Sequence, residues 1–423
     1  MLPPPASATA LRQLAWPATT PHHDAAARLR HLVAGALRTG RPLAVWREPG
    51  RAQPRLLVAR SLEASYTGLP PALDPLAPAG FAFFPFQDSD HNPALLLPAD
   101  VRYDLLQPDA IALAPTAREL TPGLAAWLTA PTPAEPLGWY QSAQPAPPAA
   151  TEAGYQALVR AGVAAIAAKQ VVKVVTSRAA HRPLPPGFDP LNSFEALVRQ
   201  HPRAFVSLVS VPGVGTWLGA TPEVLAEVTA DGRFCTMALA GTQPRRPGEA
   251  PQDAIWRQKE IEEQALVARY IVSCFKQLRL RDYHEQGPRT VAAGQLLHLR
   301  TDFEVDLQSV PHPTALGTDM LRLLHPTSAV GGMPRQAALG FIRQHEGYDR
   351  AYYSGFLGPV NVAGPGISRL YVNLRCLQVR ATEAILYAGT GLTIDSDPAR
   401  EWQETELKMQ TVGSELINVR MEK

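Results

Sequence analysis

The segment SDPAREWQETELK, at Ser396–Lys408, carries the strongest structural signal in the chain. Ser396 or Asp397 can accept hydrogen bonds from the first free N–H groups of a helix. Pro398 suits the first helical turn, where its fixed φ is favourable and its missing N–H costs no hydrogen bond. These residues predict a helix that begins at Pro398.

Three charged side chains of this helix share one face, because Glu401, Glu404 and Lys408 follow at intervals of three and four residues. The helix is either a solvated surface helix with one Glu–Lys pair or one wall of a site. The preceding segment, AILYAGTGLTIDSDP, favours a site. We expect an apolar strand that breaks at Gly389–Gly391 and presents backbone N–H groups beside the helix, as a corner for an anion and a metal ion.

Composition favours a small-molecule enzyme. The 423 residues include 40 Lys and Arg against 38 Asp and Glu, a net charge of +2, and no long basic run. This balance excludes the strong positive field typical of proteins that bind nucleic acid or anionic lipid. The length allows one large domain or two ordinary ones, with a substantial core.

The cysteines and the apolar runs bear on the compartment. Cys235, Cys274 and Cys376 are far apart, odd in number and not in metal-ligand spacing. No run approaches the ~18 apolar residues of a membrane helix, and the N-terminus lacks the apolar core of a signal peptide. We expect a soluble cytoplasmic protein with reduced thiols.

The chain divides near Pro148. Residues 1–150 are expected to form a variable, strand-rich N-terminal region with one helix over 24–39. Residues 115–150 are rich in Pro, Ala and Thr and predict a surface connection. Residues 151–423 are expected to form the region that carries the chemistry, as one compact fold.

Lys173 lies in the predicted strand QVVKVVTSR, on the same face as Val171 and Val175. On a solvated face it would be a charge that protects an edge strand. On a buried face the neutral amine is favoured, and Lys173 becomes a candidate general base. The sequence leaves both interpretations open.

Two further segments end at residues suited to a site. In TWLGATPEVLAEV, Pro222 cannot donate to a sheet, so the chain leaves the strand just before Glu223. Glu223 is then either a first-turn helix acid or an acid at a strand end. In GRFCTMALAGTQPR, Gly241 and Thr242 form either an ordinary turn or an exit where a ligand can approach the backbone.

A second carboxylate pair lies on the clearest long helix, Ile255–Leu278, where Glu260 and Glu263 are three residues apart. Two such pairs on two helices suit magnesium, which takes one or two carboxylates and keeps waters that other acids hold. His298 and Arg375 fall in predicted apolar strands. A strand histidine is usually a core residue, whereas a buried arginine requires an anion or an acid.

Taken in order, ten segments resemble signatures of the chorismate-utilising enzymes, which include isochorismate, salicylate, anthranilate and aminodeoxychorismate synthases. They are KVVTSR, GATPEVL, LAGT, KEIEE, LLHL, HPTSAVGG, SGFLGPV, LYVNLR, YAGTG and SDPAREWQETELK. The match covers residues 152–423. The resemblance implies an α+β fold similar to anthranilate synthase component I, in which antiparallel sheets pack as a sandwich surrounded by helices.

A few positions distinguish subtypes within the family. Lys173 resembles the members that add water, whereas aminating members carry glutamine there, so no amidotransferase subunit is expected. Ala329, in the loop 325–330, resembles isochorismate synthases, whereas aminating and salicylate-forming members tend to have threonine in this loop. Gln264 departs from the usual histidine, a change that can shift metal affinity without removing a ligand.

The resemblance implies magnesium-dependent conversion of chorismate to isochorismate, in which water adds at C2 and the C4 hydroxyl leaves. Lys173 is the implied base and Glu223 the implied acid. The implied metal ligands are Glu263 and Glu404, with Glu260 and Glu401 holding the metal's water molecules. The implied substrate-binding residues are Gly241, Thr242, His298, Ala329, Arg375, Gly389, Gly391 and Lys408.

Rival functions stay open at this point. The product would serve menaquinone synthesis or, with the same chemistry, a siderophore pathway. A salicylate synthase would make the same intermediate and then eliminate pyruvate. A catalytically silent metabolite-binding subunit is the rival from another class, although the complete set of charged residues argues against it.

Overall fold

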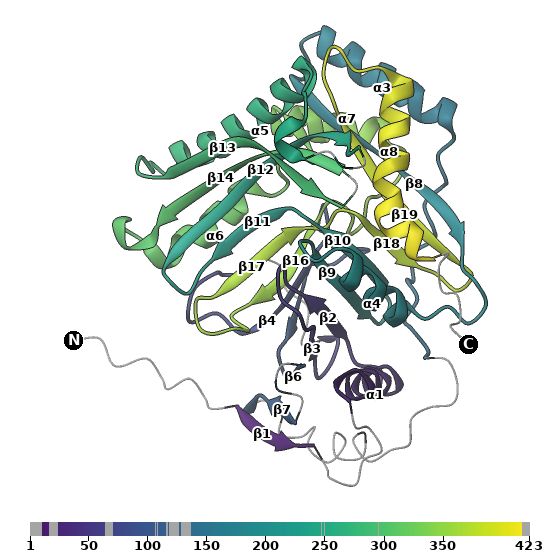
Figure 1. Cartoon of the computed structure of the whole chain (residues 1–423), viewed down its shortest axis with the longest axis vertical. Coiled ribbons are helices and arrows are strands. Elements are labelled where there is room, and N and C mark those ends of the chain that lie inside the picture. Colours follow the sequence, from purple (N-terminus) through teal and green to yellow (C-terminus); the bar gives the residue numbers. More distant parts are fainter. Residues whose placement is uncertain are drawn as a thin grey trace.

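Two large antiparallel sheets form the framework of the protein in the computed structural model (Figure 1). The structure describes residues 11–16, 24–63 and 71–416, except for 106, 108, 116, 118–126, 128–136, 247, 249 and 295. Within these residues one sheet has 11 strands and the other has eight. The helices pack around the two sheets, which confirms the predicted α+β sandwich.

The 11-stranded sheet begins with strands of the N-terminal third and ends beside the C-terminal helix. In sheet order its strands are β1 (Arg12–Ala15), β7 (Ala110–Leu113), β6 (Val101–Asp104), β3 (Arg55–Val58), β2 (Leu43–Arg47), β9 (Phe205–Val211), β10 (Gly215–Thr221), β18 (Cys376–Val379), β19 (Glu383–Leu392), β8 (Lys173–Pro183) and β15 (Gly332–Met333).

The eight-stranded sheet mixes early and late segments in the same way. In sheet order its strands are β13 (His284–Ala293), β14 (Leu296–Asp306), β12 (Arg233–Pro244), β11 (Val224–Val228), β17 (Ser368–Val372), β16 (Phe356–Val360), β4 (Gly80–Phe84) and β5 (Leu95–Pro98). Strands of the first 113 residues therefore extend both sheets. The division near residue 150 stays a prediction.

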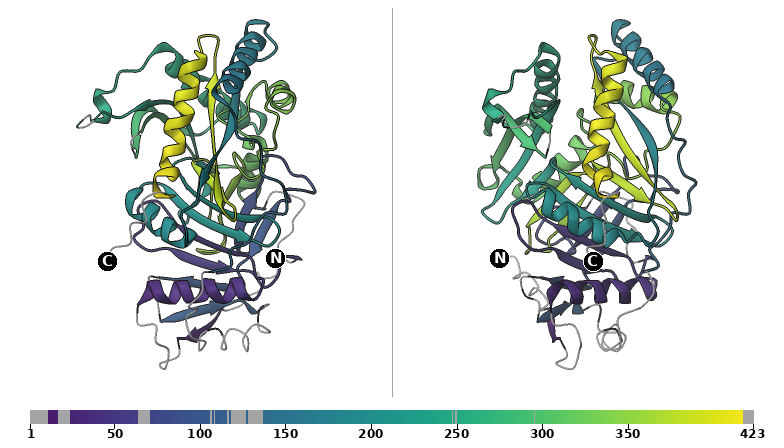
Figure 2. Two further views of the ribbon diagram at one scale, coloured as in Figure 1. Left: turned by 90° about the vertical axis from the view of Figure 1, so that its right-hand side faces the viewer. Right: turned by 45° about the vertical axis from the view of Figure 1, so that its right-hand side comes forward.

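The helices cover the outer faces of the sheets. They are α1 (Ala25–Arg38), α3 (Glu152–Ala167), α4 (Pro190–Gln200), α5 (Gln258–Gln277), α6 (Pro313–Leu324), α7 (Arg335–His345) and α8 (Pro398–Gly413), with short 3-10 turns at Pro251–Asp253, Leu307–Ser309 and Ser414–Leu416. Helices α3 and α8 lie beside β8 and β19, whereas α5 and α6 lie over β11–β14 (Figures 1 and 2).

Aromatic side chains fill the space between the sheets. Phe205 of β9 stacks on Tyr371 of β17, with ring centroids 4.1 Å apart. Phe83 of β4 meets Trp217 of β10 edge-on at 6.3 Å. These pairs join strands of opposite sheets, and such rings bury large apolar areas in preferred offset or edge-on geometries. The aromatic layer thus holds the sheets face to face.

The predicted start of the C-terminal helix is confirmed. The Asp397 side chain accepts a hydrogen bond from the Arg400 N–H at 2.9 Å, and Pro398 is the first helical residue. The long helix predicted from Ile255 instead begins at Gln258. Trp256, just before it, donates to Thr290 on β13 at 2.9 Å, which anchors the segment outside the helix.

Two local predictions are wrong. The strand does not break at Gly389–Gly391, because β19 continues to Leu392 and pairs there with β8. A Cβ on Gly389 would lie 2.6 Å from the carbonyl oxygen of Thr176, so this glycine permits close approach within the sheet. Arg375 does not lie inside a strand. It lies between β17 and β18, with a positive φ of 50°.

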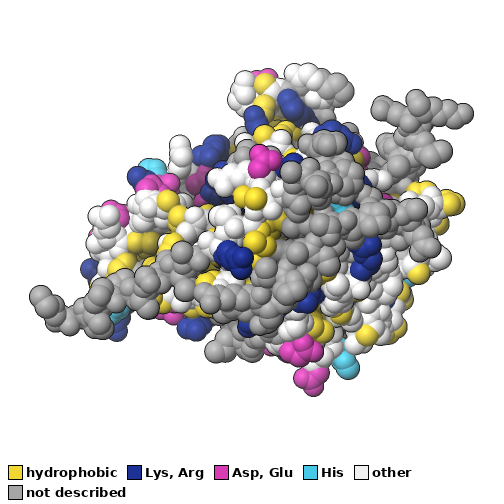
Figure 3. Space-filling view, turned by 90° about the horizontal axis from the view of Figure 1, so that it is seen from below, with side chains coloured by type: hydrophobic (Ala, Val, Ile, Leu, Met, Phe, Trp, Pro, Cys, Tyr) yellow, Lys and Arg dark blue, Asp and Glu magenta, His cyan; other side chains and the backbone are white. Residues whose placement is uncertain are grey.

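Charged side chains of both signs lie on the face seen from below, among the described residues (Figure 3). Within the residues that the structure describes, none of the helices combines the length and the apolar character needed to cross a membrane.

A buried ion pair fixes α7 and the turn after it to the sheet. The side chains of Glu346 and Arg350 are 0% and 1% exposed and form a direct contact. Glu346 also accepts from the backbone N–H of Ser177 at 2.8 Å, and Arg350 donates to the carbonyl oxygens of Val175 and Val330 at 2.7 and 2.8 Å. These contacts hold β8 against the loop before β15.

Glu346→Gln should lower the free energy of unfolding by roughly 3–5 kcal/mol, because it leaves the buried Arg350 without its counter-charge. Denaturant titration measures this change. The control is Asp319→Asn, which removes an exposed partner of Arg322 and should change stability by less than about 0.5 kcal/mol. Equal effects of the two substitutions would contradict the structural role of the buried pair.

Candidate active site

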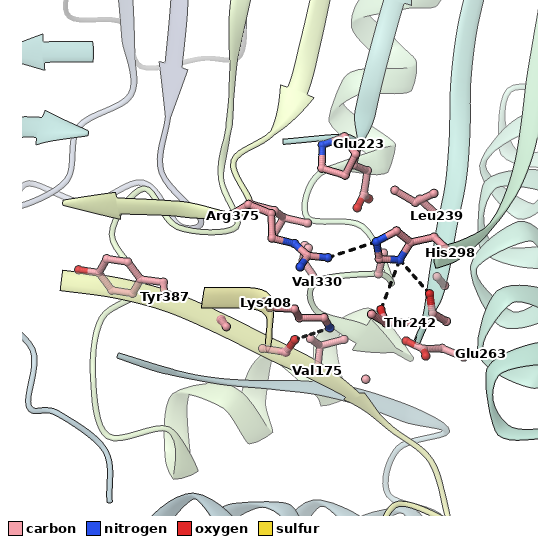
Figure 4. A pocket seen from close by; sticks show the side chains of 18 of the residues that line it. Val175, Glu223, Leu239, Thr242, Glu263, His298, Val330, Arg375, Tyr387 and Lys408 are labelled. Carbon is pink, nitrogen blue, oxygen red and sulfur yellow. Dashed lines mark hydrogen bonds between the residues drawn. The ribbon is translucent and has the colours of Figure 1, made fainter. Parts of the chain in front are cut away.

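One cavity collects most of the residues that the sequence singled out (Figure 4). It lies where β10, β12, β14 and β19 approach helices α5 and α8. The predicted residues that line it are Glu223, Gly241, Thr242, Glu263, His298, Ala329, Arg375, Gly389, Gly391 and Lys408. A second cavity shares Thr242 and is lined by Glu260, Glu401 and Glu404.

Lys173 is fully buried, so its alternative as a solvated edge charge is excluded. Its Nζ lies 3.1 Å from Oε1 of Glu263. Beyond this ion pair, the ammonium has no hydrogen-bond partner in the described part of the chain. A Cβ on Gly391 would lie 2.9 Å from Cε of Lys173 and 2.2 Å from Oε1 of Glu263. Glycine at this position therefore makes room for the pair.

Glu223 lies where the chain passes from one sheet to the other. It follows β10 of the first sheet and precedes β11 of the second. The chain therefore leaves the strand just before Glu223, as predicted from Pro222. Its side chain is buried, and burial raises the pKa of this carboxyl from 4.5 to about 7, although Lys173, Arg375 and Lys408 act in the opposite direction. Near neutral pH a large fraction of Glu223 therefore carries a proton.

Arg375 lies at a second passage between the sheets, from β17 to β18. Burial lowers the pKa of its guanidinium below the usual value. One guanidinium nitrogen, Nη1, has no partner within the described residues, and Nη2 lies 3.4 Å from Nε2 of His298. Figure 4 shows the two side chains pointing toward one another across the cavity. A buried arginine with an unpaired N–H group suits a carboxylate ligand.

His298 is held as a neutral imidazole. Burial, and then the charge of Arg375, lower its pKa to about 3. Its Nδ1 lies 2.9 Å from the carbonyl oxygen of Gly241 and must donate to it, which leaves Nε2 to accept from Arg375. Gly241 itself lies in a bulge of β12, with φ of 69°. His298 thus joins the bulge to the buried guanidinium.

Lys408 connects helix α8 to the glycines of β19. Its Nζ lies 2.6 Å from Oε1 of Glu404 and donates to the carbonyl oxygen of Gly389 at 2.8 Å. The predicted shared face of Glu404 and Lys408 is therefore present as an ion pair at i and i+4. The Lys408 ammonium also lines the main cavity, where it can contact an anionic ligand.

Glu263 and Glu404 are the carboxylates that the sequence offered as ligands of a hard cation. Burial would raise the pKa of Glu263, but the charges of Lys173, Lys259 and Lys408 lower it below the usual value, so the group is ionised. Within the described residues, no three His, Cys, Asp or Glu side chains are arranged to hold a metal ion. Magnesium typically takes only one or two direct carboxylates, and Glu263 of the main cavity and Glu404 of the second cavity are carboxylates of that kind.

Three side chains have roles that the sequence did not predict. Glu260 accepts from the backbone N–H of Arg257 at 3.1 Å and so caps its own helix. Lys259 contacts Glu401, which is 1% exposed. Lys259 was identifiable in principle, because it stands four residues before Glu263 on the same helix. Gln264 donates to Thr301 at 2.9 Å and so packs α5 on β14.

The two sheets enclose a cavity whose buried charged side chains suit a small charged ligand. The family model of chorismate binding enzymes matches residues 128–417. The chain belongs to this family.

This chain matches relatives of known function over part of their length. It is 30% identical over 263 residues to isochorismate synthase EntC of Escherichia coli K12, covering 61% of this chain and 66% of EntC. It is 35% identical over 268 residues to the salicylate biosynthesis isochorismate synthase of Pseudomonas aeruginosa PAO1, covering 62% and 54%. The chain thus matches between about half and just under two thirds of these relatives.

Two solved structures resemble the whole fold. The menaquinone-specific isochorismate synthase MenF of Escherichia coli superposes with a TM-score of 0.73 at 21% identity, covering 96% of this chain and 94% of MenF. Anthranilate synthase component I of Streptococcus pneumoniae TIGR4 gives a TM-score of 0.61 at 15% identity, covering 97% and 93%. The likeness to both confirms the fold predicted from the motifs.

Glu223 should make stability depend on pH. Because its pKa is raised from 4.5 to about 7 on folding, the folded chain binds this proton more tightly than the unfolded chain. The resulting stabilisation is complete below the unfolded pKa and is lost as the pH rises through about 7. Between these limits, the free energy of unfolding of the wild type should fall by about 3 kcal/mol relative to Glu223→Gln.

Denaturant titrations of both proteins across this pH range test the prediction. The quantity to compare is the difference in the free energy of unfolding between the two proteins at each pH, because the contributions of other titrating groups largely cancel in it. Parallel pH profiles would mean that the Glu223 carboxyl is not perturbed by burial.

Proposed function

We propose that this protein is an isochorismate synthase, an isomerase that converts chorismate to isochorismate with magnesium as its cofactor. The observation that carries the proposal is a cavity lined by an acid, with a candidate base buried directly behind its wall. Glu223 has a pKa of about 7, and the buried Lys173 lies behind the cavity wall at Glu263. Addition of water and loss of a hydroxyl require such a pair.

Lys173 is the proposed base. Its buried side chain makes a single ion pair, with Glu263 at 3.1 Å, and has no other partner among the described residues. As a neutral amine it would take a proton from water as the oxygen bonds to C2 of the ring. We propose water rather than ammonia as the nucleophile, because position 173 is lysine and not glutamine. No amidotransferase subunit is therefore proposed.

Glu223 is the proposed acid. It would give its proton to the C4 hydroxyl, which leaves as water while the ring double bond shifts. One water enters and one leaves, so the substrate and product are isomers. The proton gained by Lys173 and that lost by Glu223 return through solvent exchange.

The remaining side chains would hold the substrate. Arg375 and Lys408 present positive charge to the cavity and suit the two carboxylates of chorismate. Gly241, Thr242 and His298 would line the ring near Glu223, with Ala329 on the opposite loop. Magnesium, bound by Glu263 and Glu404 with Glu260 and Glu401 near its waters, would draw negative charge from the ring carboxylate.

For the pathway, we propose menaquinone synthesis, with siderophore synthesis as the alternative. Both start from the same product. We place the reaction in the cytoplasm, as the scattered cysteines predicted. A strain that lacks the gene for this protein can be supplied with menaquinone or with a catecholate siderophore. The compound that restores its growth identifies the pathway.

The decisive experiment gives the purified full chain chorismate with and without magnesium, and follows products by chromatography together with pyruvate release. Isochorismate formed only with magnesium and without pyruvate supports the proposal. Salicylate with stoichiometric pyruvate would replace it by a salicylate synthase. No turnover would favour the silent metabolite-binding subunit.

Lys173→Ala should lower turnover by roughly 10²-fold or more, because water loses its base. Steady-state rates of isochorismate formation measure the effect, and thermal unfolding checks that the variant folds. The control is Lys169→Ala, which removes an exposed lysine just before β8 and should leave the rate unchanged. A Lys173→Ala variant with near-normal turnover would remove Lys173 as the base.

Glu404→Gln should abolish magnesium-dependent activity, because a hard cation loses a charged ligand. The measurement is the rate as a function of magnesium concentration. Glu262→Gln, an exposed change on α5, serves as the control and should follow the wild-type curve. If the curve of Glu404→Gln also matched the wild type, the assignment of the metal ligands would be wrong.

A further inference from the structure

A larger cavity adjoins the main one. Its volume is about 520 Å³, within the range of roughly 300–1,000 Å³ that is typical of ligand sites. The C-terminal end of α4, the end of β13, the start of β14 and α8 contribute to its wall. The residues that line both cavities are Pro222, Leu239, His298 and Arg375. A ligand in the larger cavity would therefore lie next to a ligand in the main one.

The charged side chains that line this larger cavity carry one sign. Among the described residues, its lining includes two histidines and four arginines but neither aspartate nor glutamate. The arginines are Arg203, Arg245, Arg300 and Arg375, after which we call this cavity the basic chamber. Arg203 and Gly294 of the lining are exposed, so the chamber opens to solvent. A basic wall at such an opening attracts anions.

Two acids lie behind the outer part of this lining. Asp302 forms an ion pair with Arg300, with 2.6 Å between Oδ1 and Nη2. Burial lowers the pKa of His201 below its usual value, and the charge of Glu415 acts against that shift. The two acids therefore offset part of the positive charge, but neither of them lines the chamber.

Arg375 retains the capacity to bind an added carboxylate. It lines both cavities, and its Nη1 atom has no hydrogen-bond partner within the described residues. Two acids act on its guanidinium through their charge. Glu404 is paired with Lys408, and a large fraction of Glu223 is protonated near neutral pH. A carboxylate in either cavity would therefore meet an unsatisfied N–H group.

The C-terminal end of α4 would by itself disfavour an anion, because the last carbonyl groups of a helix carry partial negative charge. Arg47, which is 1% exposed, offsets this charge. It donates to the carbonyl oxygens of His201, Pro202 and Ala204 at 2.6, 2.8 and 3.0 Å. The helix end beside the chamber is thus neutralised from within the fold.

We propose that the basic chamber is a second anion site, which takes a small organic molecule with two carboxylates, and that its occupation weakens substrate binding in the main cavity. The inference rests on the proposed function, because it takes chorismate as the ligand of the main cavity. The ligand of the chamber is either excess chorismate or another dicarboxylate, since both carry the same charged groups.

The shared Arg375 is the reason for the antagonism. A carboxylate in either cavity uses the same guanidinium, whose N–H groups are limited in number. Two dianions in adjoining cavities also repel one another where water is scarce. By linkage, the second ligand raises the dissociation constant of chorismate by the same factor by which chorismate raises that of the second ligand.

Fumarate, a small rigid dicarboxylate, is the probe. Calorimetric titration of the full chain without chorismate, at an ionic strength held constant with sodium chloride, should show fumarate binding. Arg203→Gln should raise the dissociation constant about three- to fivefold, because an exposed positive charge of the chamber is lost. The matched control, Arg160→Gln, removes an exposed arginine on α3 and should bind fumarate like the wild type. Equal affinity of Arg203→Gln and the wild type, or no binding to the wild type, would overturn the proposal.

Steady-state kinetics separate the chamber from the main cavity. At saturating magnesium, fumarate should raise the KM for chorismate to a limit about fivefold above its starting value and leave kcat unchanged, because substrate still binds when the chamber is occupied. Arg203→Gln should shift this rise to higher fumarate concentrations. A KM that rises in proportion to fumarate without a limit would place fumarate in the main cavity and contradict a second site.

Chorismate alone identifies the source of the second ligand. If excess chorismate occupies the chamber, the saturation curve of the wild type should be shallower than a hyperbola, since the second molecule binds against the first. Arg203→Gln should then bring the curve closer to a hyperbola. A hyperbolic curve for the wild type would instead identify another dicarboxylate as the ligand.

Failure of the proposed function is separately visible. The fumarate titration needs no turnover, so it tests the chamber even if the chain makes a product other than isochorismate. If chorismate does not bind, the proposed function is wrong, and the effect of Arg203→Gln on fumarate still decides whether the chamber is an anion site. If chorismate binds but leaves the dissociation constant of fumarate unchanged, the antagonism is wrong.

Discussion

The buried ion pair between Lys173 and Glu263 is the interaction on which the arrangement of the site depends. It joins β8 of one sheet to α5, which packs on the other sheet. Taking two charges out of water costs several kcal/mol per ion, and the attraction between them offsets this cost only in close contact. Gly391 makes that contact sterically possible. The two halves of the site are therefore positioned by electrostatics as well as by apolar packing.

The passages between the sheets explain why acid and anion-binding groups meet in one place. Glu223 and Arg375 each lie in a short link that takes the chain from one sheet to the other. A residue in such a link is released from the strand alternation and lies at the edge of the aromatic layer, away from bulk water. The same position therefore buries Glu223, which raises its pKa, and leaves an N–H group of Arg375 without a partner.

The sequence predicted the helix caps, most strands and the set of residues around the cavity, because these depend on local patterns and on spaced motifs. It could not decide whether Lys173 is buried, since its side chain packs against Glu263 of α5 and Gly391 of β19, both distant in the chain. It also placed Arg375 inside a strand, because an apolar run does not reveal a positive φ. The glycines of β19 misled for a related reason. Glycine occurs both where a strand breaks and where another group packs closely on an intact strand. At Gly391 the close group is Glu263, which the sequence does not reveal as a neighbour.

The two glutamates of the cavity, Glu223 and Glu263, differ because their surroundings shift their pKa values in opposite directions. Glu223 has three lysine or arginine charges near it, yet burial outweighs them and favours the protonated acid. Glu263 is also screened from water, but the lysines there are close enough to outweigh burial and keep it ionised. Glu263 has the Lys173 ammonium 3.1 Å away. No direct ion pair of Glu223 is found among the described residues, and Coulomb attraction falls with separation. Two glutamates in one cavity thus acquire separate protonation states from the balance of burial and nearby positive charge at each.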